Sequence, residues 1–295
     1  MSDAGIITCA FGRRQYLEMA VDLALSVKFS SQLPVAVVSD TGGCSYFRKF
    51  YSCAFDQIIL DNTIDEVSGS ERFVRAKIAA IKHSPYRKSL FFDADVVCVR
   101  DVSALFDLIK AESFIVLGRL HHSLETCKDI VHNGVPVTQL FEHFGLSSYT
   151  HCFNCAFFFD NPGARRLVRA MEEGDRTWRP CFAPIGDNLY DEVLLGLVGP
   201  TASLTYYEGV DRLYQTQDPR FRWSDSFLFV HSSPMRLKEA ANVVMYVLKN
   251  RRRFNLRGVD AIYWAEHLLA RRAVVLGRGR RFAAVVSVVR EWIQR

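Results

Sequence analysis

The sequence lacks an apolar run long enough to cross a membrane, and it lacks a basic start of the kind that directs secretion. A membrane-spanning helix needs about 18 or more apolar residues, and no such uncharged run occurs among the 295 residues. The first five residues contain no Lys or Arg and lead directly into a short apolar segment, unlike a secretion signal. We therefore expect a cytoplasmic protein, with peripheral contact to the inner face of a membrane left open.

A disulfide framework, internal repeats and low-complexity segments are also missing. The eight cysteines follow no regular spacing, and a chain that is 49% hydrophobic has ample core for one large domain without disulfides. Cys152 and Cys155 form a Cys-x-x-Cys pair, but no second such pair or histidine pair accompanies it. We therefore expect reduced thiols and no zinc or redox centre at this pair.

Positive charge is scarce in the body of the chain and concentrated towards its end. Residues 236–295 hold 14 of the 37 Lys and Arg but 4 of the 32 Asp and Glu, a net charge of +10. The remaining residues hold 23 basic and 28 acidic side chains, a net charge of −5. We therefore divide the chain into a domain at 1–235 and a basic, helical C-terminal extension at 236–295.

The extension has an apolar helical face as well as its charge. Residues 282–293 would align Phe282, Trp292 and several valines on one side of a helix, as in helices that lie on a membrane surface. This favours a membrane over the other anionic partner, nucleic acid. The same charge would also suit a helix whose basic face is simply exposed to solvent and binds no partner.

Apolar periodicity predicts an α/β protein with a Rossmann-like, mostly parallel sheet flanked by helices, because short buried strands alternate with amphipathic helices. Strands are expected at 6–9, 34–40, 55–60, 89–92, 155–160 and 227–230. Helices are expected at 15–29, 72–82, 102–110, 164–173, 188–198 and from 236 onwards. Residues 121–148 show weak periodicity, so an irregular loop that meets substrate is expected there.

Three polar side chains follow predicted strands and suit a divalent cation. Asp93 and Asp95 come directly after the strand at 89–92, and residues two apart on extended backbone point to the same side. His231 follows the strand at 227–230, and ligands of parallel sheets gather at the carboxyl ends of the strands. Together they would leave coordination positions for phosphate oxygens. The alternative without a metal is that Asp93 and Asp95 lie in a solvated turn and that His231 is a core or capping residue.

These residues resemble the motifs of metal-dependent glycosyltransferases of the A-type fold, and most of all glycosyltransferase family eight, which includes glycogenin and bacterial lipopolysaccharide galactosyl- and glucosyltransferases. The similarity covers roughly residues 5–235. It is carried by Ile6-Ile7-Thr8-Cys9-Ala10, Arg75-Ala76-Lys77, Ser84-Pro85-Tyr86, Phe91-Phe92-Asp93-Ala94-Asp95, Phe153-Asn154-Cys155-Ala156, Asp191-Glu192 and Phe229-Val230-His231-Ser232-Ser233.

The resemblance implies a hexosyltransferase that uses Mn²⁺ or Mg²⁺ and a nucleotide-sugar donor, with UDP as the expected nucleotide. It implies a role for each matching residue: Asp93, Asp95 and His231 as metal ligands; Thr8, Ala10, Lys77, Asp93 and Lys238 in donor binding; Asn154, Asp191 and Glu192 at the reacting sugar. The chain departs from the family pattern after His231, where Ser232-Ser233 replaces the usual glycine and Lys238 stands one position out of register. Cys155-Ala156 also replaces a small residue followed by glycine.

Several alternatives stay open at the level of sequence. Asp191 and Glu192 also suit the first turn of any helix, where the dipole favours carboxylates. The family retains the sugar's configuration, whereas inversion would need a base such as Glu192 or Asp191. A lipid-linked saccharide or lipopolysaccharide-type glycan is the expected acceptor, and modified phage-type DNA is the alternative.

Two other functions compete with sugar transfer. A sugar-nucleotide pyrophosphorylase has a related sheet, but its glycine-rich N-terminal loop is missing, since residues 8–14 contain one glycine. A protein that binds nucleotide sugars without turnover is the other alternative, and intact Asp93, Asp95 and His231 disfavour it.

Overall fold

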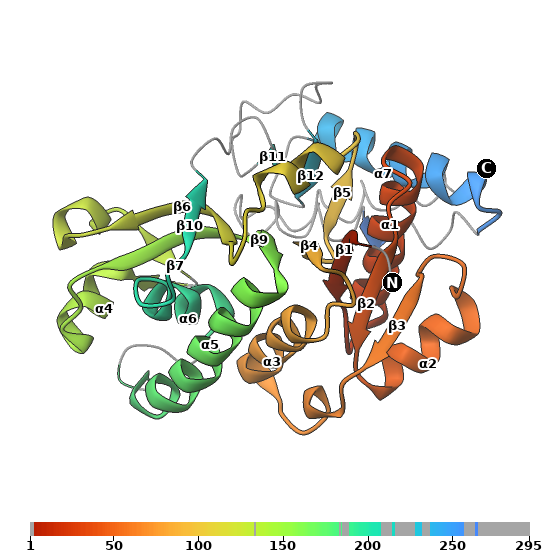
Figure 1. Cartoon of the computed structure of the whole chain (residues 1–295). Helices are drawn as coiled ribbons and strands as arrows, with labels where there is room; N and C mark the ends of the chain where they lie inside the picture. Colours follow the sequence, from red (N-terminus) through yellow and green to blue (C-terminus); the bar gives the residue numbers. More distant parts are fainter. Residues whose placement is uncertain are drawn as a thin grey trace.

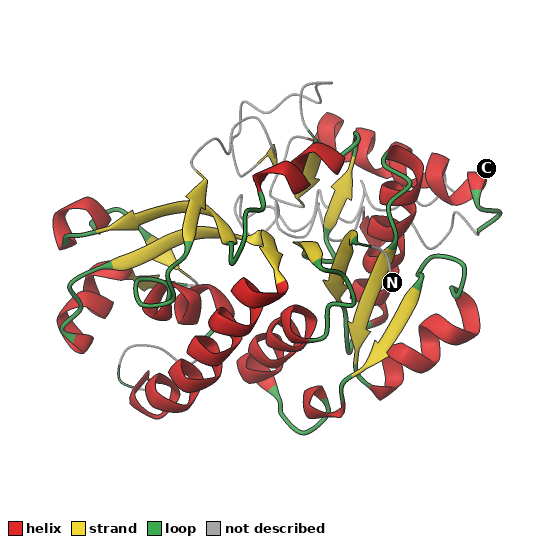
Figure 2. Ribbon diagram, in the orientation of Figure 1, coloured by secondary structure: helices red, strands yellow, loops and turns green. Residues whose placement is uncertain are grey.

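A seven-stranded sheet runs through the centre of the computed structural model, with helices on both faces (Figures 1 and 2). The structure describes residues 3–132, 134–182, 184, 189–207, 214–215, 228–231, 237–256 and 263–264, with the backbone alone at 154, 214–215 and 237–241. The strand order is β10-β6-β9-β4-β1-β2-β3. The strands of this sheet are β1 (Ala4–Cys9), β2 (Val35–Ser39), β3 (Gln57–Leu60), β4 (Lys88–Phe92), β6 (Phe114–His121), β9 (Tyr149–Asp160) and β10 (Thr205–Tyr207).

The sheet is mostly parallel, as the sequence predicts. Strands β1, β2, β3 and β4 pair in parallel, as do β6 and β10, while β9 runs antiparallel between β4 and β6. A second, three-stranded sheet contains β5 (Val96–Cys98), β11 (Tyr214–Gln215) and β12 (Phe229–His231). Because β5 follows β4 after a short turn, the two sheets meet beside Asp93 and Asp95.

Alternate side chains of the central strands enter two hydrophobic cores, one on each face of the sheet. Leu90 and Phe92 pack towards α1 (Arg14–Ser30) and α7 (Leu237–Arg253). Phe91, between them, packs towards the opposite face, which is covered by α3 (Gly69–Lys82), α5 (Asn161–Phe182) and α6 (Asp191–Val198). Figure 1 shows α1 and α7 side by side although they come from opposite ends of the described chain. The α/β architecture with flanking helices is therefore confirmed.

A β-bulge interrupts the pairing of β6 with β9 next to the end of β4. Val116 pairs with Phe157 but the next residue, Leu117, pairs with Phe153, so residues 154–156 of β9 lie between the two pairs. Gly118 follows the bulge, and a Cβ there would lie 2.1 Å from the carbonyl oxygen of His151. Such irregularities occur often beside active sites because they redirect the chain.

Helix α7 is anchored on α1 by a buried ion-pair network. The guanidinium of Arg251, which is fully buried, lies 2.6 Å from Asp22 and 2.8 Å from Glu18, and the indole of Trp264 donates to Asp22 at 2.9 Å. The helix predicted from residue 236 is thus confirmed up to Arg253. Residues 265–295, with the predicted amphipathic segment at 282–293, lie outside the described residues, and the division at residue 235 stays a prediction.

The prediction of an irregular segment at 121–148 is wrong. It contains the strand pair β7 (Val131–His132) and β8 (Val135–Pro136) and the helix α4 (Val137–Phe144). Helix α4 buries Val137, Leu140 and Phe141, a helical spacing too brief to stand out in the sequence. Strand β6 was likewise not predicted.

Other element boundaries also differ from the predictions. Helix α2 (Thr41–Phe50) begins where Gly42 and Gly43 suggest a loop, because the carboxylate of Asp40 accepts a hydrogen bond from Gly43 at 2.6 Å and caps it. Helix α5 begins at Asn161 rather than 164, α6 at Asp191 rather than 188, and residues 103–108 form a 3₁₀ helix.

Candidate active site

Asp93 and Asp95 lie in the turn that leads from the central sheet into the smaller one. The backbone N–H of Asp93 donates to the carbonyl of Cys155 at 2.9 Å, and the N–H of Val96 donates to the carbonyl of Asp93 at 3.1 Å. These bonds fix the turn between β4 and β5 and hold it against β9. The side chain of Asp95 is 11% exposed and that of Asp93 is 27% exposed, so a small ligand can still reach both carboxylates.

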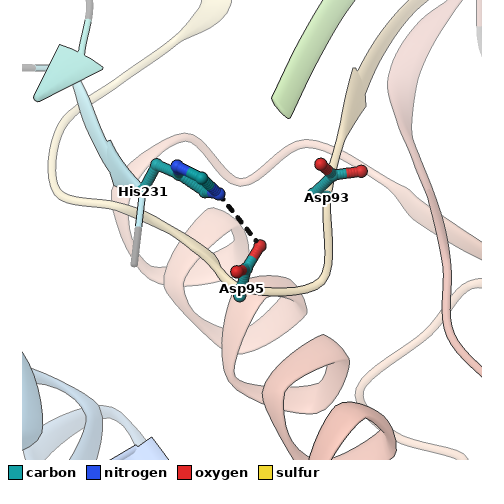
Figure 3. Close-up of side chains that lie close together, drawn as sticks. All are labelled: Asp93, Asp95 and His231. Atoms are coloured by element: carbon teal, nitrogen blue, oxygen red, sulfur yellow. Dashed lines mark ion pairs between the residues drawn. The ribbon is translucent and has the colours of Figure 1, made fainter. Parts of the chain in front are cut away.

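His231 joins the two aspartates because β12 pairs with β5 in antiparallel register. This register places His231 opposite Val96, directly after Asp95 in the chain. Its Nε2 lies 3.3 Å from Oδ1 of Asp95. Figure 3 shows the imidazole directed at Asp95, with Asp93 at the end of the strand that enters the same turn. One ligand atom from each of the three side chains lies within 4.8 Å of the other two.

This cluster has the donor set of a divalent-cation site. Two carboxylates and one imidazole suit ions such as Mn²⁺ or Mg²⁺ and leave positions for phosphate oxygens. The pKa of Asp93 is raised to about 6: burial is the main cause, the charge of Lys77 and, less strongly, that of His231 oppose it, and the neighbouring carboxylates of Asp95 and Asp191 add to it. The residues therefore concentrate negative charge where it is poorly solvated, which fits a bound cation.

Lys77 connects this cluster to a second pair of carboxyl groups. Its Nζ lies 3.1 Å from Oδ1 of Asp93 and 2.6 Å from Oδ2 of Asp191. The side chain is buried, and its ammonium lies above the ring of Phe157, 5.5 Å from the centroid. Burial alone would lower the pKa of Lys77, but the charges of Asp191 and Asp93 outweigh it and raise the pKa. Lys77 therefore remains a cation inside the site.

Asp191 and Glu192 form the first turn of α6 and face the same region. Burial raises the pKa of Glu192, and the adjacent charge of Asp191 adds to this effect. Helix α6 sits close against β9, because Gly196 leaves no space for a Cβ beside the ring of Tyr149. Asp191 thus places a carboxylate where a helix N-terminus favours it and at the same time contacts Lys77.

The other predicted residues differ in how closely they approach this centre. Thr8 and Ala10 are buried on and just after β1, and Thr8 Oγ1 has no hydrogen-bond partner among the described residues. Cys9, between them, is near enough to Asp93 for that charge to contribute to raising its pKa, although burial contributes more. Asn154 lies in the β-bulge of β9. It directly precedes Cys155, whose carbonyl accepts the hydrogen bond from the backbone N–H of Asp93. Lys238 lies in α7; its side chain, like that of Asn154, is outside the described part of the chain.

One polar group near the site was not predicted. Asp40 follows β2, accepts a hydrogen bond from the backbone of Gly12 at 3.1 Å and pairs with Arg72. The guanidinium of Arg72 lies 5.2 Å from the ring centroid of Phe11. The sequence signal that could have identified Asp40 is the one used for Asp93: an aspartate at the end of a buried strand.

An aromatic row continues from Phe11 towards α6. The ring of Phe73 is 5.3 Å from that of Phe11 and 6.5 Å from that of Tyr190, measured between centroids. Phe73 is 44% exposed, so this row offers an apolar surface between the loop after β1 and the residue that caps α6.

Solved structures of glycosyltransferases have the same architecture. The galactosyltransferase LgtC in complex with donor and acceptor sugar analogs superposes with a TM-score of 0.53 at 12% identity, over 84% of this chain and 95% of LgtC. The chain has the A-type glycosyltransferase fold.

Two further glycosyltransferases share this fold with the chain. GlyE of Streptococcus pneumoniae TIGR4 gives a TM-score of 0.52 at 13% identity over 83% of this chain, and the bifunctional WbbM gives 0.51 at 10% over 78%. The matched parts span 61% of the GlyE chain and 45% of the WbbM chain. No protein-family model and no curated protein matches the sequence. At these identities the similarity establishes the fold.

Proposed function

We propose that the protein is a glycosyltransferase that moves a sugar from a nucleoside-diphosphate sugar, a UDP-sugar by the family resemblance, to an acceptor hydroxyl. The observation that carries the proposal is the position of Lys77, which joins the Asp93–Asp95–His231 cluster to Asp191. A metal-binding cluster beside a buried cation suits a diphosphate leaving group. LgtC, which shares the fold, was solved with donor and acceptor sugar analogs.

Asp93, Asp95 and His231 would hold Mn²⁺ or Mg²⁺ in this proposal. The bound cation would supply positive charge against the diphosphate as the glycosidic bond breaks. Lys77 is already buried beside the cluster, so it would stabilise the same developing charge after only a local exchange of contacts. When the donor binds, the Lys77 ammonium would exchange part of its contact with Asp93 or Asp191 for a phosphate oxygen.

The remaining residues would bind and orient the donor. Thr8 and Ala10 lie at the end of β1, where the nucleotide would enter, and Lys238 would approach the diphosphate from α7. Asn154, Asp191 and Glu192 would surround the transferred sugar from β9 and α6. Asp191 would orient a sugar hydroxyl through its carboxylate, while Glu192, whose pKa is raised by burial, would be able to donate a hydrogen bond when protonated.

The transfer would retain the configuration of the sugar. The acceptor oxygen forms a bond to the anomeric carbon from the face that the diphosphate leaves, and the bond from that carbon to the diphosphate oxygen breaks. The hydroxyl proton passes to the departing diphosphate, so no strong base of the protein is required. Inversion would instead need Asp191 or Glu192 to take that proton from the opposite face.

The acceptor is proposed to be a lipid-linked saccharide or a lipopolysaccharide-type glycan. The support is the charge of residues 236–295, which begin with α7, where Arg252 and Arg253 are exposed. Among the described residues, no helix is both long and apolar enough to cross a membrane. The proposed contact is a peripheral one, made by the basic side chains. Cosedimentation of the full chain with anionic and neutral vesicles tests this, and salt-sensitive binding to DNA without vesicle binding would favour the nucleic-acid alternative.

A panel of nucleotide sugars tests the transferase proposal. Slow hydrolysis of one donor in the presence of Mn²⁺, lost with chelator and in Asp95→Asn, is the expected result. Asp107→Asn is the matched control, because Asp107 is exposed and lies away from the cluster. Binding of a donor with no hydrolysis or transfer to any glycan would favour the nucleotide-sugar-binding alternative.

A further inference from the structure

Two aromatic rings lie against the buried ammonium of Lys77, and the proposed transfer gives them no role. Nζ of Lys77 is 5.3 Å from the ring centroid of Phe91 and 5.5 Å from that of Phe157. The two rings are stacked, with their centroids 5.4 Å apart and their planes at 21° to each other. Because these three separations are nearly equal, the ammonium lies over the junction of the two rings.

The pairing of β4 with β9 fixes the position of this ring pair. Phe91 and Phe157 stand directly opposite each other in the antiparallel register. Residues two apart on extended backbone point to the same side, so Phe91 and Asp93 share a side of the chain. Lys77 therefore reaches past the ring of Phe91 to the carboxylate of Asp93, 3.1 Å away.

The rings meet the charged end of Lys77 where water is excluded. Phe91 is 0% exposed, Phe157 is 1% exposed and Lys77 is 5% exposed. The face of an aromatic ring carries partial negative charge and attracts a cation within about 6 Å of the centroid, most strongly in a desolvated position. The two ring faces thus add to the attraction that Asp93 and Asp191 exert on the ammonium.

The rings differ from the two carboxylates in what happens when the donor binds. The Lys77 ammonium would then exchange part of its contact with Asp93 or Asp191 for a phosphate oxygen. Phe91 and Phe157 offer no ligand atom to a metal and no charge for the diphosphate to displace, so their contact would persist through the exchange. They would therefore limit how far the ammonium moves.

We propose that Phe91 and Phe157 are positioning residues, whose ring faces hold the ammonium of Lys77 where it meets the diphosphate. The part that concerns the diphosphate rests on the proposed function, whereas the contact between rings and ammonium does not. Negative charge develops on the diphosphate as the glycosidic bond breaks, so weaker positioning of Lys77 should lower kcat rather than raise KM.

Fluorination of the rings tests this role, because fluorine withdraws electron density from the ring face while changing the shape of the side chain little. Trifluorophenylalanine is placed at position 157 of the full chain and, as a matched control, at position 159, in the wild type and in Lys77→Met. Phe159 is buried on the same strand and stacks on Phe114, with centroids 5.2 Å apart. In the described part of the chain, no cation lies over its ring.

Urea unfolding measures the contact without any donor. In the wild-type background, fluorination at 157 should lower the folding equilibrium constant about fivefold more than fluorination at 159. In Lys77→Met, which lacks the ammonium, the two positions should give equal changes, since the cycle isolates the interaction of ring and cation. Equal changes in the wild type, or a difference that persists in Lys77→Met, would overturn the contact.

Donor hydrolysis tests the positioning role separately. Fluorination at 157 should lower kcat about fivefold with KM unchanged, and fluorination at 159 should alter neither. An unchanged kcat in a chain that shows the coupling would overturn the role. Monofluorophenylalanine at 157, with a smaller effect in the same direction, replaces the trifluoro ring if circular dichroism shows that the latter disturbs folding. If the wild type hydrolyses no donor, the transferase proposal fails, while urea unfolding still decides the contact.

Discussion

The Nζ atom of Lys77 in α3 lies 2.6 Å from Oδ2 of Asp191, the first residue of α6, although the two residues are distant in the chain. The same ammonium contacts Asp93 at 3.1 Å. A single buried side chain thus connects the end of a central strand, the N-terminus of a helix and the candidate metal ligands.

Replacing Lys77 with methionine is expected to reduce both activity and stability. Asp93 and Asp191 would lose the cation that compensates them, which we expect to cost about 1–3 kcal/mol of the free energy of unfolding, less than a fully buried pair because both carboxylates keep some contact with solvent. Donor hydrolysis should fall about 100-fold, the typical effect of removing one preorganised charge.

Lys82→Met is the matched control for this change. Lys82 ends the same helix, but its pair with Glu172 is exposed, so the substitution should alter stability by less than about 1 kcal/mol. Urea unfolding and hydrolysis rates measure both variants. Equal rates for Lys77→Met and Lys82→Met would remove Lys77 from the mechanism.

The contact between α7 and α1 predicts a large effect at Arg251. Arg251→Leu leaves Glu18 and Asp22 buried without their cation, and breaking such a pair costs about 3–5 kcal/mol. Arg252→Leu, at the exposed next position, should change stability by no more than about 0.5 kcal/mol. Urea unfolding separates the two. Similar midpoints would mean that α7 is a dispensable appendage.

Two Gly→Ala substitutions should change the stability of the protein in opposite directions. In Gly196→Ala the new Cβ would meet the ring of the buried Tyr149 at 2.1 Å, and overpacking of this kind costs about 1–3 kcal/mol. In Gly42→Ala the nearest atom is 3.9 Å away, within α2, so greater helix propensity should stabilise the protein by up to about 1 kcal/mol. Thermal unfolding of each variant measures whether its Tm rises or falls. A destabilising Gly42→Ala would contradict the capped helix at that position.

Thiol labelling tests the environment of the cysteines. All eight are free, but only Cys53 and Cys181 are exposed. Burial raises the pKa of Cys98 and Cys152, and a buried, protonated thiol reacts slowly. A thiol reagent should therefore label about two groups quickly in the folded protein and all eight in denaturant. Rapid labelling that survives Cys53→Ser and Cys181→Ser would instead indicate a reactive buried thiol.

The sequence allowed the cluster of Asp93, Asp95 and His231 to be anticipated because each residue follows an apolar strand, and strand ends converge at one edge of a sheet. The parallel order of β1, β2 and β4 was predictable for a similar reason: each is a short buried run separated by a helix. The roles of these residues in donor binding and catalysis stay predictions.

The link from Lys77 to Asp191 was not predictable from local pattern, because α3 and α6 approach each other only through packing on the same face of the sheet. Helix α4 and strand β6 were missed for different reasons. Helix α4 is short, and β6 carries Gly118 and a bulge that disrupt a simple strand pattern. The buried Arg251 was hidden within a basic run, where sequence alone suggests solvent exposure.

The central claim is that Asp93, Asp95 and His231 bind a divalent cation together with a nucleoside diphosphate. The most direct measurement is the Tm of the wild type and of Asp95→Asn with Mn²⁺ alone, with each of the common nucleoside diphosphates alone, and with both. A Tm rise for one nucleotide that requires Mn²⁺ and disappears in Asp95→Asn is the predicted result. A rise that is the same without Mn²⁺ or in Asp95→Asn, or no rise with any nucleotide, would contradict the claim.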